Sequence, residues 1–312
     1  MWWHRFHAIQ NVLKRRYCTK TTLSYRVFKD ERNAFNSDPS KLNTAVILHG
    51  ILGNKLNWRT FASKLATTIP NWQFIPVDLR GHGDSDSHSE PHSVQACAKD
   101  VMNLTDEIGV HPQAIIGHSF GGKVALSFLE LCKAQGRPYP KQSWILDVLP
   151  GSRGECNVQQ SLNSSVDLVL SILKSIQLPI HSKGQLIKDL QARGLDMSLA
   201  QWLSKNLRVI PNDPEKYEWK MNIPVVEQLF ESFRSLDLWP ILFDTNLRAT
   251  NTEVHFVQAE KNRMWTPQVL KRLESAESNG VYRHVLPKSG HWVHVDNPNG
   301  LFQVLQRNWI IG

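Results

Sequence analysis

The sequence has few cysteines, no metal-binding motif and no acidic residue at its N-terminal end. The chain of 312 residues holds four cysteines, Cys18, Cys97, Cys132 and Cys156. Their spacing matches neither a disulfide framework nor a metal site, so we expect reduced thiols and no bound metal. The apolar stretch near the N-terminus is too short and too charged for a secretory signal or a membrane span, and we expect no integral membrane segment.

The formal net charge of +8 comes from the N-terminus. Residues 1–29 contain seven Lys and Arg residues and no Asp or Glu, which leaves 29 basic against 28 acidic residues in the rest of the chain. A body that is nearly neutral gives no support to nucleic-acid binding, and we expect none.

The acid-free N-terminus resembles a targeting segment. Apolar residues recur there at helical spacing, beside basic ones: Trp2, Trp3, Phe6, Ile9, Leu13, Arg5, Lys14, Arg15 and Arg16. An amphipathic, arginine-containing leader of this kind is typical of organelle import. We predict a mitochondrial transit peptide over residues 1–20, cleavage near Tyr17 and a location in the mitochondrial matrix. The alternative is a surface helix that the mature protein retains.

Apolar runs that fit buried strands alternate with helical patterns along much of the chain. Strands are expected at residues 23–28, 44–48, 73–77, 114–116, 143–146, 253–257 and 282–286, and helices at 58–69, 94–108, 267–275 and 299–309, with a further helix beginning after residue 119. Such alternation predicts an α/β fold with a mostly parallel central sheet flanked by helices.

Between residues 151 and 247 the pattern changes. Helices are expected at 166–176, 184–192, 198–207 and 224–236, with no strand-like apolar run among them. We therefore predict a helical cap over residues 151–247, inserted between two parts of the core at 21–150 and 248–312. Its large aromatic residues are expected to belong to the core of the cap more often than to an acyl pocket: Trp202, Trp219, Phe230, Phe233 and Trp239.

The segment Gly117-His118-Ser119-Phe120-Gly121 joins an expected strand directly to an expected helix. This is the spacing of a nucleophile elbow. A turn this sharp strains the backbone of the serine. It also brings neighbouring backbone against the positions two residues before and two residues after the serine, so glycine is needed at both. The context predicts Ser119 as a nucleophile.

A serine nucleophile needs a base and an oxyanion hole. His291 follows the last expected strand, comes after a glycine and is our candidate base. The backbone N–H groups of Phe120 and Ile51 are the candidate oxyanion donors, and Gly50 leaves room for the substrate carbonyl. Four other histidines are expected to be structural: His49, His82 and His118 as braces of turns, and His294 within an apolar stretch.

Two residues could supply the acid that orients His291. The loop after residues 253–257 contains Glu260, but Asn262 stands where the common Gly-Glu-x-Asp pattern has its aspartate. Asp147 follows the preceding expected strand, nearer the nucleophile. We favour Asp147 and keep Glu260 as the alternative; both preserve the order Ser, acid, His.

Together these motifs resemble the α/β-hydrolase superfamily over roughly residues 22–310. In detail the chain is similar to the α/β-hydrolase domain-containing protein 11 group and to related bacterial esterases. The segments that carry the resemblance are Leu48-His49-Gly50-Ile51-Leu52-Gly53, Asp78-Leu79-Arg80-Gly81-His82-Gly83-Asp84-Ser85, Gly117-His118-Ser119-Phe120-Gly121-Gly122-Lys123, Leu146-Asp147-Val148 and Gly290-His291-Trp292-Val293-His294. The resemblance implies a mitochondrial serine hydrolase that acts on carboxylic esters or thioesters without a cofactor.

The leading hypothesis is hydrolysis of a small-molecule ester or acyl substrate. Serine at the elbow argues against epoxide hydrolase or dehalogenase chemistry, which needs a carboxylate nucleophile. The alternatives are a lipid or acyl-thioester hydrolase, an acyltransferase, and a ligand receptor that keeps the fold without catalysis.

Overall fold

The computed structural model describes residues 23–30, 42–87, 89–152 and 159–309. The predicted transit peptide at residues 1–20 lies outside them, as do Cys18 and Cys156. Cys97 and Cys132 are free and buried, and the described residues contain no cluster of side chains that could hold a metal ion. None of the helices in these ranges combines the length and the apolar character needed to cross a membrane.

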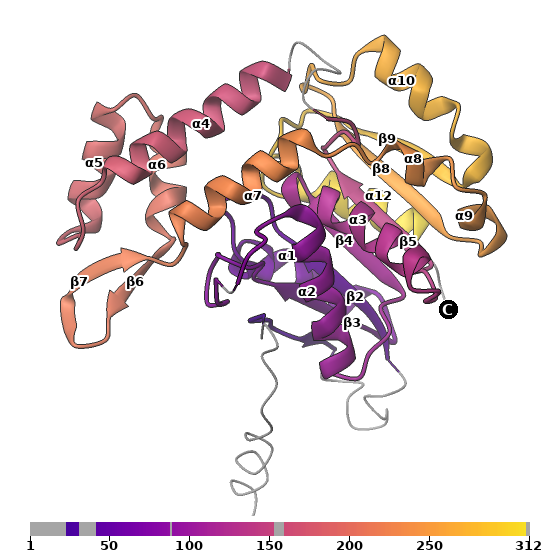
Figure 1. Ribbon diagram of the computed structural model, residues 1–312, viewed down its shortest axis with the longest axis horizontal. Helices are drawn as coiled ribbons and strands as arrows, with labels where there is room; N and C mark the ends of the chain where they lie inside the picture. Colours follow the sequence, from indigo (N-terminus) through magenta and orange to yellow (C-terminus); the bar gives the residue numbers. More distant parts are fainter. Residues whose placement is uncertain (1–22, 31–41, 88, 153–158, 310–312) are drawn as a thin grey trace, which may run out of the picture.

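A seven-stranded, mostly parallel sheet forms the centre of the molecule (Figure 1). The strand order is β1-β3-β2-β4-β5-β8-β9, and only the β1–β3 pair is antiparallel. The strands are β1 (Phe28–Lys29), β2 (Asn43–Leu48), β3 (Trp72–Val77), β4 (Ala114–His118), β5 (Gln142–Leu146), β8 (Glu253–Ala259) and β9 (Val281–Leu286). The predicted α/β fold with a parallel sheet is therefore confirmed.

Helices cover both faces of this sheet. The core helices are α1 (Arg59–Thr68), α2 (Val94–Glu107), α3 (Phe120–Ala134), α8 (Trp239–Leu242), α9 (Thr245–Ala249), α10 (Pro267–Glu274), α11 (Val293–Asp296) and α12 (Pro298–Asn308), with 3-10 turns η2 (Lys55–Trp58) and η3 (Glu277–Asn279). Alternate residues of β2 show the two layers: Val46 and Leu48 pack with α2 and α3, whereas Ala45 and Ile47 pack with α1 and α12. Burial on both faces explains why these strands are continuous apolar runs.

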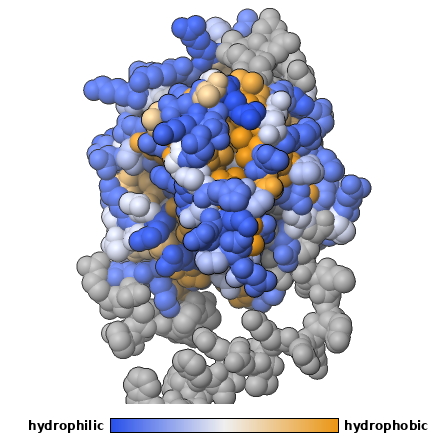
Figure 2. Space-filling view, turned by 90° about the vertical axis from the view of Figure 1, so that its left-hand side faces the viewer, coloured by the Kyte–Doolittle hydropathy of each residue, from blue (hydrophilic) through white to orange (hydrophobic). Residues whose placement is uncertain are grey.

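Most of the described chain between β5 and α8 lies to one side of the core (Figure 1). It contains α4 (Gln159–Ser175), α5 (Lys183–Ala192), α6 (Met197–Ser204), β6 (Leu207–Ile210), β7 (Asp213–Trp219) and α7 (Ile223–Ser235). From this side, apolar residues gather at the centre of a face that is otherwise largely polar (Figure 2). The cap boundaries at residues 151 and 247 stay a prediction.

The expectation that this segment has no strand was wrong. β6 and β7 form an antiparallel hairpin, and the helix expected at 198–207 ends at Ser204. The sequence did not indicate these strands because β7 is mostly polar and only its last residue is buried, so its residues do not form an apolar run. The first strand is also shorter than expected: β1 holds two residues, and Tyr25 contributes a single bridge to Val77.

Hydrogen bonds connect this cap to the loop that follows β2. The side chain of Asn206 donates to the Leu52 carbonyl oxygen at 2.8 Å and accepts from the Asn54 amide at 2.5 Å. Both bonds are buried. They place the turn between α6 and β6 against residues 49–53, the His-Gly loop.

Candidate active site

Ser119 occupies a strained turn between β4 and α3. Its backbone has φ 52° and ψ −116°, a conformation that costs free energy for a residue with a side chain. Glycine is required on both sides: a Cβ on Gly117 would lie 2.1 Å from the Gly121 carbonyl oxygen, and one on Gly121 would lie 2.5 Å from the Leu48 carbonyl oxygen. The Gly-x-Ser-x-Gly spacing therefore has the expected cause: the backbone passes too close to residues 117 and 121 for any side chain.

His291 and Asp147 meet although 144 residues separate them. Nδ1 of His291 lies 2.8 Å from Oδ2 of Asp147. Asp147 stands directly after β5, where its own N–H donates to the Val257 carbonyl oxygen of the neighbouring strand. Because a carboxylate can only accept a hydrogen bond, this bond places the proton of a neutral His291 on Nδ1. Nε2 then keeps its lone pair and can accept a proton.

Asp147 is fully buried and receives three more hydrogen bonds. Oδ1 accepts from the Ala259 N–H and from the indole Nε1 of Trp265, both at 2.9 Å. Oδ2 also accepts from the side-chain amide of Asn262 at 2.6 Å. Asn262, which stands where the common pattern has an aspartate, thus donates a hydrogen bond to Asp147.

Glu260 lies elsewhere. Its Oε2 accepts from the backbone N–H of Lys288 at 2.7 Å in an exposed contact. The structure therefore brings Asp147, and not Glu260, to His291.

The His-Gly loop after β2 lies against the elbow. A Cβ on Gly50 would be 3.1 Å from Nδ1 of His118 and 3.3 Å from Cβ of Ser119, so glycine permits the close approach. His49 accepts from the Leu79 N–H through Nε2 at 3.0 Å and donates through Nδ1 to the Gly50 carbonyl oxygen at 2.8 Å. The loop is thereby tied to the strand end next to it.

His82 supports the same loop. Its Nε2 accepts from the Leu52 N–H at 3.1 Å, and its Nδ1 donates to the Arg80 carbonyl oxygen at 3.0 Å. Burial lowers the pKa of His49 to about 4 and that of His82 to about 3. Both rings are therefore neutral at pH 7, as donor-acceptor braces must be.

His118 lies beneath the candidate base. Its Nε2 is 2.8 Å from the carbonyl oxygen of His291, to which it donates. Burial, with the nearby His291 and His294, holds its pKa well below the usual range. A neutral His118 thus helps to hold the loop that carries His291.

A cavity of about 540 Å³ opens at the elbow. Ser119, His291 and Asp147 line it together with Ile51 and Phe120. The cap contributes one side of its apolar wall: Val166, Val169, Leu199, Trp202, Phe230 and Phe233. Three of the five cap aromatics considered from the sequence thus line the cavity, whereas Trp219 and Trp239 are buried outside it.

The sequence model of the family described as "Alpha/beta hydrolase family" matches residues 45–304. The chain belongs to the alpha/beta hydrolase family.

Relatives of this alpha/beta hydrolase include lipases and esterases. It is 26% identical over 268 residues to the mouse (Mus musculus) "sn-1-specific diacylglycerol lipase ABHD11", covering 82% of this chain and 78% of that protein. It is 21% identical over 260 residues to the zebrafish (Danio rerio) protein of the same name, covering 81% and 74%. The solved structure "Marine microorganism esterase" superposes with a TM-score of 0.75 at 22% identity, covering 92% and 99%. These names support a hydrolase; the structural match supports the fold.

Two parts of the site in this alpha/beta hydrolase were missed from sequence. Trp265 had no signal, because a tryptophan in a loop does not indicate which carboxylate its indole will bond. Trp58, at the end of η2, stacks on His294 with ring centres 4.3 Å apart. Burial lowers the pKa of His294 to about 4, and its ring contacts that of His118, so the expected structural role fits its surroundings.

Proposed function

We propose that the protein is a serine hydrolase that cleaves carboxylic esters. Ser119 Oγ transfers its proton to Nε2 of His291 and attacks the ester carbonyl carbon. His291 then gives this proton to the departing alcohol oxygen, which leaves an acyl group on Ser119. Water, deprotonated by His291, attacks the acyl-enzyme and releases the carboxylic acid and free Ser119. No cofactor takes part in these steps.

Asp147 stabilises the positive charge that His291 carries between the two proton transfers. The observation that carries the proposal is the 2.8 Å bond between these two residues, which line the same cavity as Ser119. The three donors from Ala259, Asn262 and Trp265 hold the Asp147 carboxyl group in place against His291.

The oxyanion of the tetrahedral intermediate needs two donors. Phe120 is the first residue of α3, and the first N–H groups of a helix have no acceptor within it. Ile51 lines the same cavity from the His-Gly loop, where the next N–H, that of Leu52, is already bonded to His82. We assign the N–H groups of Phe120 and Ile51 to the oxyanion, a contribution of roughly 3 kcal/mol for each donor.

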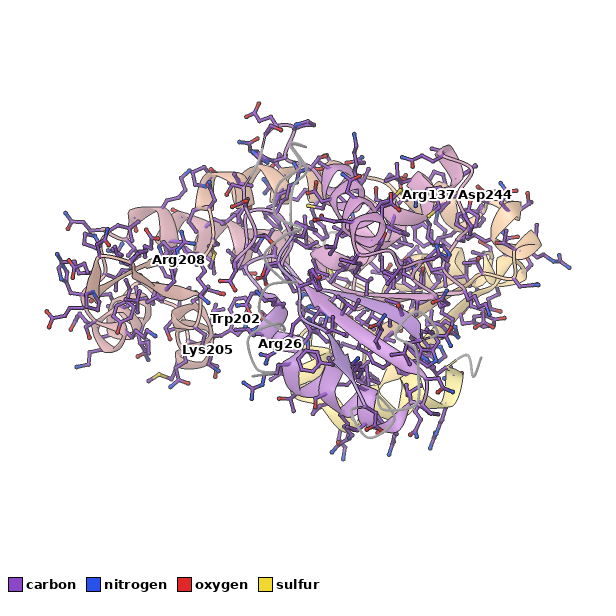
Figure 3. The ribbon with its side chains drawn as sticks, turned by 90° about the horizontal axis from the view of Figure 1, so that it is seen from below. Arg26, Arg137, Trp202, Lys205, Arg208 and Asp244 are labelled. Atoms are coloured by element: carbon purple, nitrogen blue, oxygen red, sulfur yellow. The ribbon has the colours of Figure 1, made fainter. Side chains whose placement is uncertain are left out.

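The charge at the mouth favours an uncharged leaving group. Among the described residues that line the cavity there are Asp196 and Asp296, both exposed, and no Lys or Arg. The basic residues of the cap that Figure 3 labels, Lys205 and Arg208, are not part of this lining. An acyl ester of a neutral alcohol, such as the diacylglycerol in the name of the mouse relative, suits this mouth better than an anionic acyl-CoA.

A set of matched substrates tests this proposal. Wild-type protein should be labelled by a fluorophosphonate probe and should hydrolyse an octanoyl glycerol ester and a neutral octanoyl thioester of N-acetylcysteamine. The kcat/KM for octanoyl-CoA should be about tenfold or more lower than for the neutral thioester, because the two differ in leaving-group charge. An equal or higher value for octanoyl-CoA would contradict the neutral-alcohol assignment. Absence of both labelling and hydrolysis would instead favour a ligand receptor.

We also propose a mitochondrial location from the acid-free leader at residues 1–20. The mature protein isolated from its source should begin near Tyr17. Detection of an intact Met1 by mass spectrometry would refute import with cleavage.

A further inference from the structure

Lys123 is a fully buried cation that the proposed reaction does not use. It lies on α3, four residues after Ser119, and its side chain is enclosed between the core and the cap. Its Nζ lies 2.6 Å from the carbonyl oxygen of Gly151 and 2.8 Å from each of the carbonyl oxygens of Phe233 and Leu236. An ammonium group has three protons to donate, which these three oxygens can accept.

The three carbonyls belong to both ends of the cap. Gly151 lies where the chain leaves the core after β5, and Phe233 and Leu236 lie in the last turn of α7 and directly after it. The adjacent bond from the Leu238 N–H to the Pro150 carbonyl oxygen joins the same two stretches. Lys123 therefore ties the outgoing and the returning chain to the helix that begins at the elbow.

Charge explains why a lysine suits this place. The carbonyl end of a helix carries the negative end of its dipole, so a cation at the end of α7 is stabilised there. The ammonium also lies 4.7 Å from the centre of the Phe233 ring, a cation–π distance. An uncharged apolar side chain would leave buried carbonyl oxygens without these donors.

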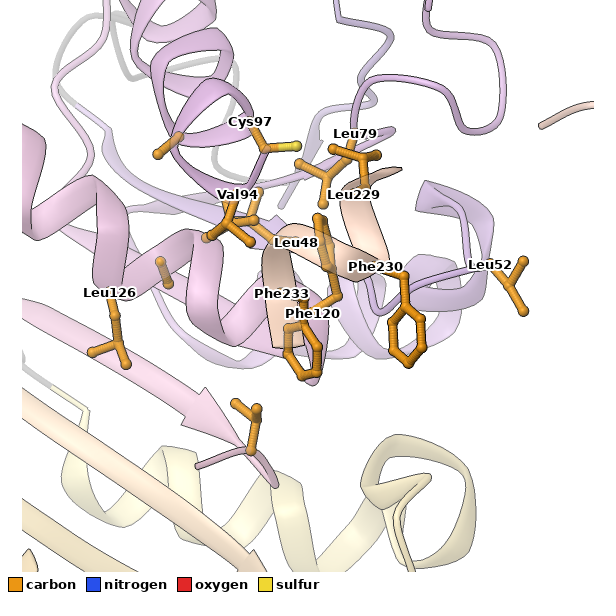
Figure 4. Close-up of a cluster of buried hydrophobic side chains, with 14 of the residues drawn as sticks. Leu48, Leu52, Leu79, Val94, Cys97, Phe120, Leu126, Leu229, Phe230 and Phe233 are labelled. Carbon is orange, nitrogen blue, oxygen red and sulfur yellow. The ribbon is translucent and has the colours of Figure 1, made fainter. Parts of the chain in front are cut away.

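Phe233 links this tie to the cavity. It lines the cavity with Phe230 from the same helix, and its ring centre is 6.0 Å from that of Phe120, the neighbour of Ser119 (Figure 4). The position of α7 against α3 therefore sets how far the apolar wall stands from the elbow.

We propose that Lys123 is a positioning residue that sets acyl-chain selectivity by holding the end of α7, and with it Phe233, against the elbow helix. The inference rests on the proposed ester hydrolase function and deepens it. Lys123 does not touch the reacting atoms. Its effect should grow with the length of acyl chain that contacts the wall.

The test compares Lys123→Met with Lys133→Met, a lysine of the same helix whose exposed side chain pairs with Asp244. For Lys123→Met the ratio of kcat/KM between p-nitrophenyl octanoate and p-nitrophenyl acetate should fall about tenfold or more, mainly through the KM of the octanoate. Lys133→Met should leave this ratio as in wild type. Simple loss of folded protein would lower the apparent kcat/KM for both substrates equally and would leave their ratio unchanged.

Two further measurements keep the outcome decisive. If Lys123→Met does not fold, Lys123→Arg should still shift the ratio in the same direction, because a planar guanidinium cannot reproduce the three bonds of an ammonium. Calorimetric binding of the neutral octanoyl glycerol ester to the Ser119→Ala protein needs no turnover and should weaken about tenfold when Lys123→Met is added. An unchanged ratio in an active variant, or unchanged binding of the octanoyl glycerol ester, would overturn the positioning role. A wild type that hydrolyses neither ester would count against the proposed function instead.

Discussion

Ser119→Ala should lower kcat for ester hydrolysis by about 10⁶-fold, because removal of the nucleophile leaves only binding and the oxyanion donors. The backbone conformation of the elbow should stay as in the wild type. Alanine meets the same backbone strain at φ 52° as serine, and no hydrogen bond of the Ser119 side chain caps α3. Steady-state hydrolysis of p-nitrophenyl octanoate and labelling by a fluorophosphonate probe measure the effect.

Ser127→Ala is the matched control. Ser127 is buried in the same helix, and it does not line the cavity. This variant should keep its probe labelling, and its kcat should stay within about tenfold of wild type. If Ser119→Ala retained labelling or a substantial part of its kcat while folded, Ser119 would not be the nucleophile.

Asp147→Asn should lower kcat by about 10⁴-fold, the effect expected when the residue that orients a catalytic histidine loses its charge. An amide can present its N–H₂ group to His291, which would place the ring proton on Nε2, the atom that must accept the proton of Ser119. An amide also cannot balance the charge of the imidazolium. Its oxygen can still accept from Ala259 and Trp265, so the fold should tolerate the change better than the chemistry does.

Glu260→Gln separates the two candidate acids. Its side chain bonds the Lys288 N–H at the surface, and glutamine offers an oxygen for the same bond. The kcat of this variant should therefore stay within about twofold of wild type, as for most surface changes. A large loss in Glu260→Gln with little change in Asp147→Asn would transfer the orienting role to Glu260.

Some features follow from local sequence because their causes are local. The central strands β2, β3, β4 and β5 are short, mostly apolar runs buried on both faces. The glycines at 117 and 121 are required by backbone contacts within the turn and with the end of β2. Placing His291 at the same edge of the sheet needed only the rule that parallel strands end together. The family resemblance rested on the same segments, and the match of the alpha/beta hydrolase family to residues 45–304 confirms it.

Other features depend on residues that are distant in sequence. The sequence left two candidates for the acid beside His291, because Asp147 and Glu260 follow adjacent strands. The packing of the loop after β8 decides between them. It brings Asn262 and Trp265 to Asp147, whereas Glu260 bonds the backbone of Lys288. The β6–β7 hairpin was missed because its strands are held by pairing to each other rather than by an apolar face.

The sequence by itself determined the strand-turn-helix that presents Ser119, since strain and close backbone contacts there leave few alternatives. Only the tertiary structure decided which carboxylate lies against His291 and why α3 carries a lysine as its fourth residue. Each of these depends on carbonyls, amides and rings brought together from segments 28 to 144 residues apart, and no local pattern of residues encodes these contacts.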